Sequence, residues 1–221
     1  MILKRYRSDY KGEFVVTTTN LQDGSKRQNR IWIPNLVENQ HISNRAAAIG
    51  SNMDRKKFNY SILERHRGGL MGNLRLQTYG TNTIWQDMKL DFYAGTNRQE
   101  LETLAKTEYA DNTVILTSTS HCVENPGKFY TVPYLPMIDD VALPLYLACF
   151  DGHTEIFLLG YNSDMPHGTL NWQQDVLSVF QIYDDVQFTL VGNHFSAPDS
   201  WRNCRNVQSM DYRKFISYCD I

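Results

Sequence analysis

The sequence lacks several features that would each assign a class at once. Its four cysteines include no CxxC pair, which argues against a zinc site. No window is apolar over the length of a membrane span. Neither sign of charge predominates, since 24 acidic and 22 basic residues leave a net charge of -2. Neither nucleic acid nor an anionic membrane is therefore an expected partner.

The cysteines and the amino terminus indicate a reducing compartment. We expect Cys149, inside an apolar helical run, to be a small buried hydrophobe, and the other cysteines to be free thiols. The opening MILKRYRSDYKGEF has no apolar stretch long enough for a signal peptide. A cytoplasmic location follows as the expectation.

Common catalytic and cofactor motifs are missing as well. The chain has no complete GxGxxG, no GxxxxGK[ST], no HExxH and no GxSxG. These absences argue against a classical NAD site, a P-loop, a zinc protease and a serine hydrolase. We predict neither a metal nor a cofactor.

What is present is an ordinary globular composition, with 42% hydrophobic and 21% charged residues. The first 44 residues have a sequence pattern that differs from that of the rest of the chain. Strands at 14–19 and 30–34 flank a polar turn at 22–25, which predicts a β-hairpin. We therefore divide the chain into an amino-terminal hairpin extension, residues 1–44, and a larger domain, residues 45–221.

From residue 45 onward, short apolar strands alternate with helical stretches. Predicted strands lie at 45–49, 91–95, 113–118, 155–161 and 187–193, with a less regular one near Val207. Predicted helices lie at 58–66, 98–109, 138–150 and 171–186, and a last one follows near the end of the chain. This rhythm predicts an α/β fold, a Rossmann-like parallel sheet with helices on both faces, preceded by the β-hairpin.

Three residues mark helix boundaries. Asn97 precedes a helical run with Glu100 three residues on, as in a capping box. Asn171 is the expected cap of the 171–186 helix. Pro144 should kink or delay the helix in its segment, because proline lacks a backbone donor.

Ligands of open parallel sheets bind beyond the carboxyl ends of the strands. Glycine and amide residues stand at these positions here: Gly50, Ser51 and Asn52, then Asn97, then Asn162. They permit close backbone approach and supply neutral hydrogen-bonding groups, which suit a nucleotide or a sugar. The competing interpretation is that each is a turn former.

A glycine-rich segment at 68–82 is a second candidate. Its residues Thr78, Tyr79, Gly80 and Asn82 could lie against a phosphate or sugar, with Arg75 as counter-charge. A surface Ω-loop explains the same pattern equally well.

Two histidines follow predicted strands, where a general base could stand. These are His121 and His194, and neither has metal-ligand spacing. Asp139 and Asp140 stand together at a helix start, where they suit the helix dipole better than a metal.

The ordered set IGSNMDR, GGLMGNLRLQTYGTN, LDFYAGTN and YLACFDGHTEIFLLGYN resembles phage-encoded and bacterial proteins of the sialyltransferase-like and MptE-like (DUF115) Rossmann families. The resemblance runs from about residue 45 to 162. It implies a nucleotide pocket at these strand ends and transfer of a sugar or a phosphate-containing group from a nucleotide-activated donor. It also implies a phage protein in the host cytoplasm, with the virion as the alternative location.

Three departures from the family pattern predict a weakened or altered site. Asn52 stands where the family usually has a second glycine, and Asn97 and Asn162 stand where it usually has aspartate. Asparagine keeps the size of aspartate but loses its charge. Our hypothesis is a glycosyltransferase-like protein that binds a nucleotide or nucleotide sugar, with His121 or His194 as base and with catalysis weakened or lost. The alternative is a phage structural or accessory protein that keeps the fold without catalysis, with virion proteins or a second copy of itself as partner.

Overall fold

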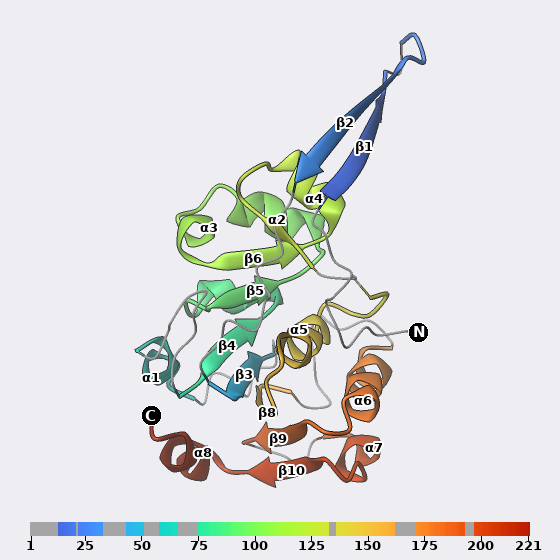
Figure 1. Ribbon diagram of the computed structural model, residues 1–221. Helices are drawn as coiled ribbons and strands as arrows, with labels where there is room; N and C mark the ends of the chain where they lie inside the picture. Colours follow the sequence, from blue (N-terminus) through green and yellow to red (C-terminus); the bar gives the residue numbers. More distant parts are fainter. Residues whose placement is uncertain are drawn as a thin grey trace.

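The computed structural model describes residues 13–20, 22–32, 43–50, 58–65, 75–132, 136–161, 171–192 and 197–221. Within these ranges the strands form two sheets, one of two strands and one of eight. The larger sheet is the centre of the molecule, and helices cover both of its faces (Figure 1).

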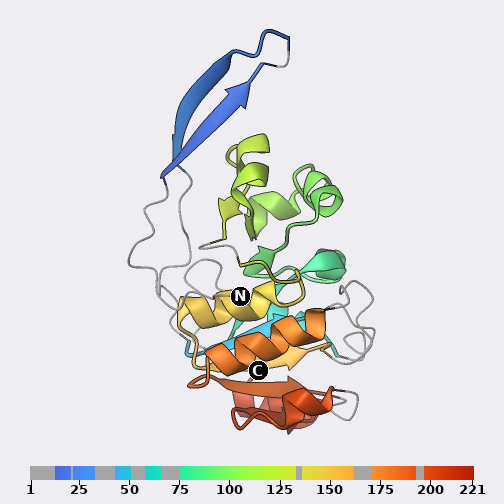
Figure 2. The same cartoon turned by 90° about the vertical axis from the view of Figure 1, so that its right-hand side faces the viewer.

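The small sheet is the predicted hairpin. Strand β1 (Glu13–Thr19) pairs antiparallel with β2 (Lys26–Trp32). The hairpin stands apart from the larger sheet in two perpendicular views (Figures 1 and 2). β2 begins at Lys26 rather than at the predicted Arg30, because backbone pairing with Thr19 extends the ladder through polar residues.

The large sheet is entirely parallel, as the alternation predicts. Its strands in spatial order run β10-β9-β8-β3-β4-β5-β6-β7. Their bounds are β3 (Arg45–Ile49), β4 (Gln77–Gly80), β5 (Phe92–Ala94), β6 (Val114–Thr117), β7 (Tyr130–Thr131), β8 (Glu155–Leu159), β9 (Gln187–Val191) and β10 (Val207–Met210).

Strand order reverses at β3. The chain proceeds from β3 outward through β4, β5, β6 and β7, and then returns to place β8 on the other side of β3. The carboxyl ends of β3 and β8 therefore form the topological switch point of a doubly wound sheet, where ligands of such folds bind.

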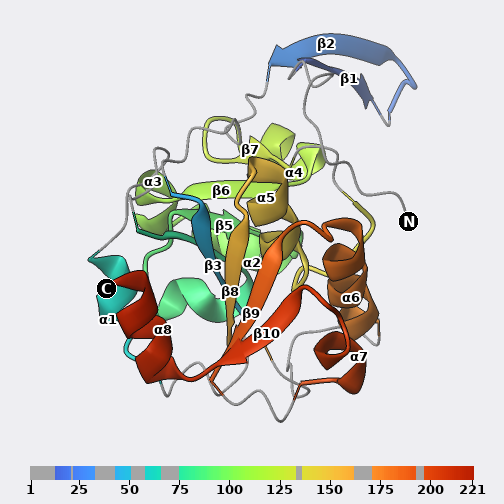
Figure 3. The same cartoon turned by 60° about the horizontal axis from the view of Figure 1, so that its bottom comes forward.

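The two faces carry different helices (Figure 3). One face packs against α5 (Leu143–Asp151), α6 (Trp172–Ile182) and α7 (Asp199–Arg202). The other packs against α1 (Ser61–Glu64), the 3-10 helix η3 (Asn82–Gln86), α2 (Arg98–Leu104), α3 (Tyr109–Asn112), α4 (Thr119–Glu124) and α8 (Tyr212–Cys219).

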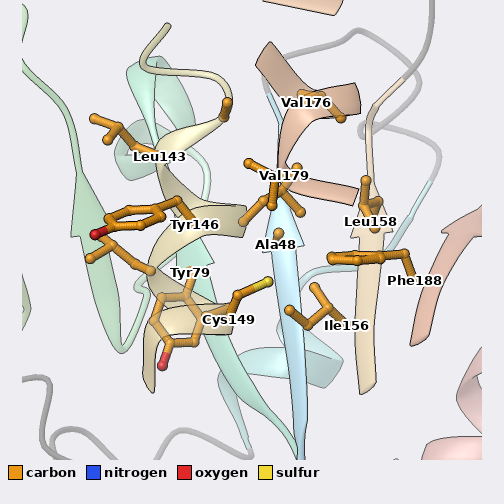
Figure 4. Close-up of a cluster of buried hydrophobic side chains, with 14 of the residues drawn as sticks. Ala48, Tyr79, Leu143, Tyr146, Cys149, Ile156, Leu158, Val176, Val179 and Phe188 are labelled. Atoms are coloured by element: carbon orange, nitrogen blue, oxygen red, sulfur yellow. The ribbon is translucent and has the colours of Figure 1, made fainter. Parts of the chain in front are cut away.

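Alternation along β3 builds both cores. Ala46 and Ala48 face α5 and α6, whereas Ala47 and Ile49 face the opposite layer. Every residue of α5 is buried, so this helix forms the centre of its layer rather than an amphipathic cover. Figure 4 shows the core on this side, with Tyr79 and Phe188 among its aromatic residues.

Helix boundaries follow the predicted signals in two of three cases. The side chain of Asn97 accepts the backbone N–H of Glu100 at 3.2 Å, and Pro144 lies in the first turn of α5 and delays its start to Leu143. Asn171 occupies the N-cap position of α6, but its side chain makes no capping bond. The expectation for Asn171 was wrong because its backbone is helical, which points the side chain away from the free N–H groups.

The sequence interpretation missed β4. Residues 77–80 were assigned to a glycine-rich loop, yet they form a buried strand between β3 and β5. All four cysteines are free thiols, and Cys122, Cys149 and Cys219 are buried. Among the helices of the described ranges, none has the length and hydropathy to cross a bilayer.

Candidate functional site at the carboxyl edge of the sheet

Parallel strands bring their carboxyl ends to one edge, and the turns after β3, β4, β5, β6 and β8 therefore gather there. Gly50, Thr81, Gly95 and Ser118 begin four of these turns. The expected convergence of loops is observed as far as the structure describes them. Four residues predicted for the site, Ser51, Asn52, Asn162 and His194, lie outside the described residues.

At the switch point the first turn and the β8 turn are joined directly. The backbone N–H of Gly50 donates to the carbonyl of Leu159 at 2.8 Å. Gly160 follows with φ of 71°, a left-handed conformation that glycine adopts without strain. The opening of the IGSN stretch therefore lies beside the end of β8, at the position where the fold class binds ligands.

Asp140 organises the turn after β5. Its carboxylate accepts the N–H of Thr96 at 2.7 Å, the hydroxyl of Thr96 at 2.7 Å and the N–H of Asn97 at 3.2 Å. Burial raises the pKa of Asp140, although the bonds from Thr96 oppose this shift. The hydrogen bonds of the Asp140 carboxylate thus go to a turn from another strand rather than to the N–H groups of α5.

A second contact fixes the segment before α5 over the same edge. The hydroxyl of Tyr161, which follows β8, donates to the carbonyl of Val141 at 2.9 Å. The carboxylate of Asp139 accepts the N–H of Val141, and the N–H of Asp139 donates to Asp175 on α6. Residues 139–141 therefore connect the β5 turn, the β8 end and α6.

His121 lies in α4 and reaches the β5 turn. Its Nε2 is 3.2 Å from the carbonyl of Thr96, and its Nδ1 is 3.5 Å from Oε2 of Glu124. Because a carbonyl oxygen can only accept, Nε2 carries the proton in this contact. The other nitrogen, Nδ1, is the atom of His121 that can take up a proton.

Three buried polar groups at this edge have no hydrogen-bond partner among the described residues. They are the hydroxyl of Thr81, the amide nitrogen of Asn82 and the hydroxyl of Thr117. Thr81 and Asn82 directly follow β4, and Thr117 ends β6. Buried polar groups are almost always paired, so three such groups at the carboxyl edge are candidates to bind ligand atoms.

Asn82 also has an unusual backbone. Its φ is 52°, in the left-handed region that few residues other than glycine adopt. Asn82 as a residue is 8% exposed. Strain of this kind concentrates at ligand sites, although asparagine tolerates it better than most residues.

Three predicted residues of β4 have structural partners instead. Thr78 exchanges hydrogen bonds with Asp91, which precedes β5 at the amino edge. A β-carbon on Gly80 would lie 2.7 Å from a side-chain carbon of Leu90, so glycine is required there by packing. Thr78 and Gly80 are thus accounted for without a ligand.

Tyr79 points toward the amino edge as well. Its hydroxyl donates to Oδ2 of Asp151 at 2.9 Å and lies 3.0 Å from Nε2 of His153, just before β8. The Tyr79 ring stacks on Phe92 with centroids 5.0 Å apart. This buried cluster makes Tyr79 a core residue, and we leave it out of the proposed site together with Thr78 and Gly80.

Arg75 is not a counter-charge at this edge. Its guanidinium donates to the carbonyl of Asp220 and lies 3.4 Å from the Asp220 carboxylate, which ties the start of β4 to the end of α8. Asn97 is exposed, and its side-chain oxygen caps α2. That capping bond explains the asparagine at this position but leaves its amide nitrogen for other contacts.

The sequence interpretation missed Thr81, Thr117 and Asp140 as site residues. The sequence signal that could have identified the threonines is a polar residue at the end of an apolar strand. No local pattern could pair Asp140 with Thr96, because 44 residues separate them. Within the described ranges, no group of three or more histidine, cysteine, aspartate or glutamate side chains is placed to hold a metal ion.

Comparison with known proteins adds little. No protein-family model matches the chain, and neither does any curated protein. Among solved structures it is similar to the sialyltransferase CstII from Campylobacter jejuni, in complex with the substrate analogue cytidine-5'-monophosphate. The TM-score is 0.39 at 11% identity, over 70% of this chain and 80% of that chain. Likeness at this level says nothing about activity, and the fold stands on the strand order described above.

Proposed function

We propose that the protein binds a nucleotide or nucleotide sugar at the carboxyl edge of its sheet, as a glycosyltransferase-like protein with weakened or lost catalysis. The observation that carries the proposal is the set of three unpartnered buried groups on Thr81, Asn82 and Thr117. Their position at the carboxyl edge of a doubly wound sheet supports it. The sequence resemblance at the same strand ends supports the choice of ligand.

The available groups suit a neutral form of recognition. A hydroxyl can donate or accept and an amide nitrogen donates, so these side chains can bind phosphate oxygens or sugar hydroxyls. Gly50 and Gly160 leave room for close approach of a ligand to the backbone. Asn52 and Asn162 remain proposed contacts on the strength of their place after β3 and β8.

Catalysis, where it is retained, would use a histidine as base. In His121 the proton on Nε2 is held by the carbonyl of Thr96, so Nδ1 would accept the proton of an acceptor hydroxyl. Glu124 stands 3.5 Å from Nδ1 and would stabilise the ring once it is protonated. His194 remains the second candidate from its place after β9.

Thermal unfolding with a panel of nucleotides and nucleotide sugars at millimolar concentration tests binding. A ligand present at 100 times its dissociation constant should stabilise the fold by about 2.7 kcal/mol. If no member of the panel raises the melting temperature, the proposal is wrong. Release of labelled sugar from a nucleotide sugar that binds would separate a transferase from a binding protein, and His121→Ala should abolish that release.

A second candidate function is a structural or accessory role in a phage particle. The observation that favours it is the β1–β2 hairpin, which forms a separate sheet. A lone two-stranded hairpin is marginal in water, so a partner surface would stabilise it. Stoichiometric presence of the protein in purified particles would support this role, and its absence from them would exclude it.

A further inference from the structure

A cavity lies at the opposite, amino edge of the sheet. Its volume is about 550 Å³, and its walls include Asp91, Thr113, Val114 and Tyr130. These residues stand immediately before or at the start of β5, β6 and β7, so the cavity opens at the amino edge. The four residues of β6 span about 13 Å at 3.3 Å each, which separates this cavity from the carboxyl edge.

The size of the cavity fits a small organic ligand. Ligand pockets commonly enclose about 300–1,000 Å³. A single metal ion or phosphate would leave most of the 550 Å³ unfilled.

The charged residues of the wall, Asp91, Asp111 and Lys128, sum to one negative charge, and each already has a partner. Nζ of Lys128 is 2.5 Å from Oδ1 of Asp111, so the cation already has its counter-ion. Asp91 is fully buried, and Oδ2 of its carboxylate accepts the hydroxyl and N–H of Thr78. The wall therefore offers no excess of positive charge to bind a phosphate and no open acidic surface to bind a polycation.

The remaining wall mixes hydroxyls, an amide and small apolar groups. Thr113 is 7% exposed, and its hydroxyl has no hydrogen-bond partner among the described residues. The amide of Asn112 donates to the carbonyl of Glu108, which fixes the side chain at the rim. Ala110 and Gly127 add small residues to the wall, and Tyr130, whose side chain is partly buried against the core, adds an aromatic one.

From this combination we propose that the amino-edge cavity binds a carbohydrate, as a mono- or disaccharide unit. A sugar presents many hydroxyls that both donate and accept, together with an apolar ring face that packs on an aromatic side chain. Asp111, Lys128 and Asn112 supply the polar contacts, and Tyr130 supplies the stacking surface. The site is separate from the proposed nucleotide site and does not depend on it.

Saturation-transfer NMR on the intact protein tests the proposal. The probes are glucose, galactose, N-acetylglucosamine, glucuronic acid, N-acetylneuraminic acid and lactose, each at millimolar concentration. At least one sugar should receive saturation. Tyr130→Ala should weaken its binding about fivefold to tenfold, because stacking on an aromatic ring contributes about 1 kcal/mol.

Control variants separate the cavity from the rest of the surface. Lys128→Ala should weaken sugar binding without unfolding the protein, since exposed ion pairs contribute little to stability. Lys106→Ala makes the same charge change on an exposed residue outside the cavity wall and should have no effect. Tyr130→Phe keeps the ring and should keep most of the binding if Tyr130→Ala fails to fold.

Two results would overturn the proposal. One is that no sugar in the panel receives saturation from the folded protein. The other is that sugars bind as well to Lys128→Ala, and to Tyr130→Ala where it folds, as to the wild type. Binding of inorganic phosphate or spermidine in place of sugars would also count against it. Thr117→Val, at the other edge, should leave sugar binding unchanged, so the two proposed sites can fail independently.

Discussion

A buried hydroxyl without a partner gives the sharpest test of the carboxyl-edge site. Thr117 is 0% exposed at the end of β6, and its Oγ1 has no hydrogen-bond partner among the described residues. Valine has the same branched shape with a methyl group in place of the hydroxyl, and it suits a strand equally well. Thr117→Val should therefore preserve the fold.

The variant should be more stable than the wild type but bind nucleotide less well. Burying a hydroxyl without a hydrogen bond costs about 1–3 kcal/mol, and valine removes that cost. We expect the free energy of unfolding to rise by about 1 kcal/mol, which in a chain of this size raises the melting temperature by about 2–4 °C. Loss of one hydrogen bond to the ligand should raise the dissociation constant by about twofold to tenfold.

Urea unfolding followed by circular dichroism measures the first effect, and calorimetric titration with the best nucleotide measures the second. Thr189→Val is the matched control, because Thr189 is also 0% exposed but its hydroxyl accepts the side-chain amide of Gln208 at 3.0 Å. The control should lose about 0.5–1.5 kcal/mol of stability. If Thr117→Val loses as much as the control, its hydroxyl has a partner in the folded protein and our reasoning fails.

Three further predictions concern the same framework. Tyr79→Phe should lower stability by about 1.5–3 kcal/mol in urea unfolding, because Asp151 loses a charge-assisted hydrogen bond, and it should leave nucleotide affinity unchanged. Burial raises the pKa of Asp140, so the folded state favours its protonated form. The stability of the wild type relative to Asp140→Asn should therefore fall as pH rises from about 3.9 through the raised pKa. A flat difference across that range would contradict this sign. Ellman's reagent at pH 8 should modify Cys204 first in the native protein, because the other cysteines are buried.

Sequence reasoning succeeded where the signal is local. The apolar runs at β3 and β8 are short, bounded by glycine and rich in β-formers or alanine, and both strands lie where predicted. Pro144 delayed its helix as expected, since the missing N–H is tolerated only in a first turn. Parallel pairing followed from the alternation of strands and helices alone.

Sequence reasoning failed where the local sequence favours one structure and contacts with distant segments impose another. β4 has only four residues and follows a glycine-rich stretch, so its local pattern favours a loop. It is a strand because β3 and β5 supply hydrogen bonds on both sides. The roles of Thr78 and Tyr79 were missed for the same reason, because their partners Asp91 and Asp151 come from distant segments.

The turn after β5 shows how such distant contacts change the interpretation of a substitution. Asn97 stands where the family pattern has aspartate, and from sequence this predicts the loss of negative charge. In the structure, Asp140 places a carboxylate against the same turn, bound to the N–H groups of Thr96 and Asn97. A carboxyl group is therefore present at the turn, and its oxygens are engaged by the N–H groups of Thr96 and Asn97 and by the hydroxyl of Thr96. An aspartate at position 97 would add a second carboxylate beside Asp140, and like charges this close disfavour ionisation of both. Asn97 is accounted for by its cap on α2 and by its backbone bond to Asp140, so its identity by itself does not show that a ligand site has been lost.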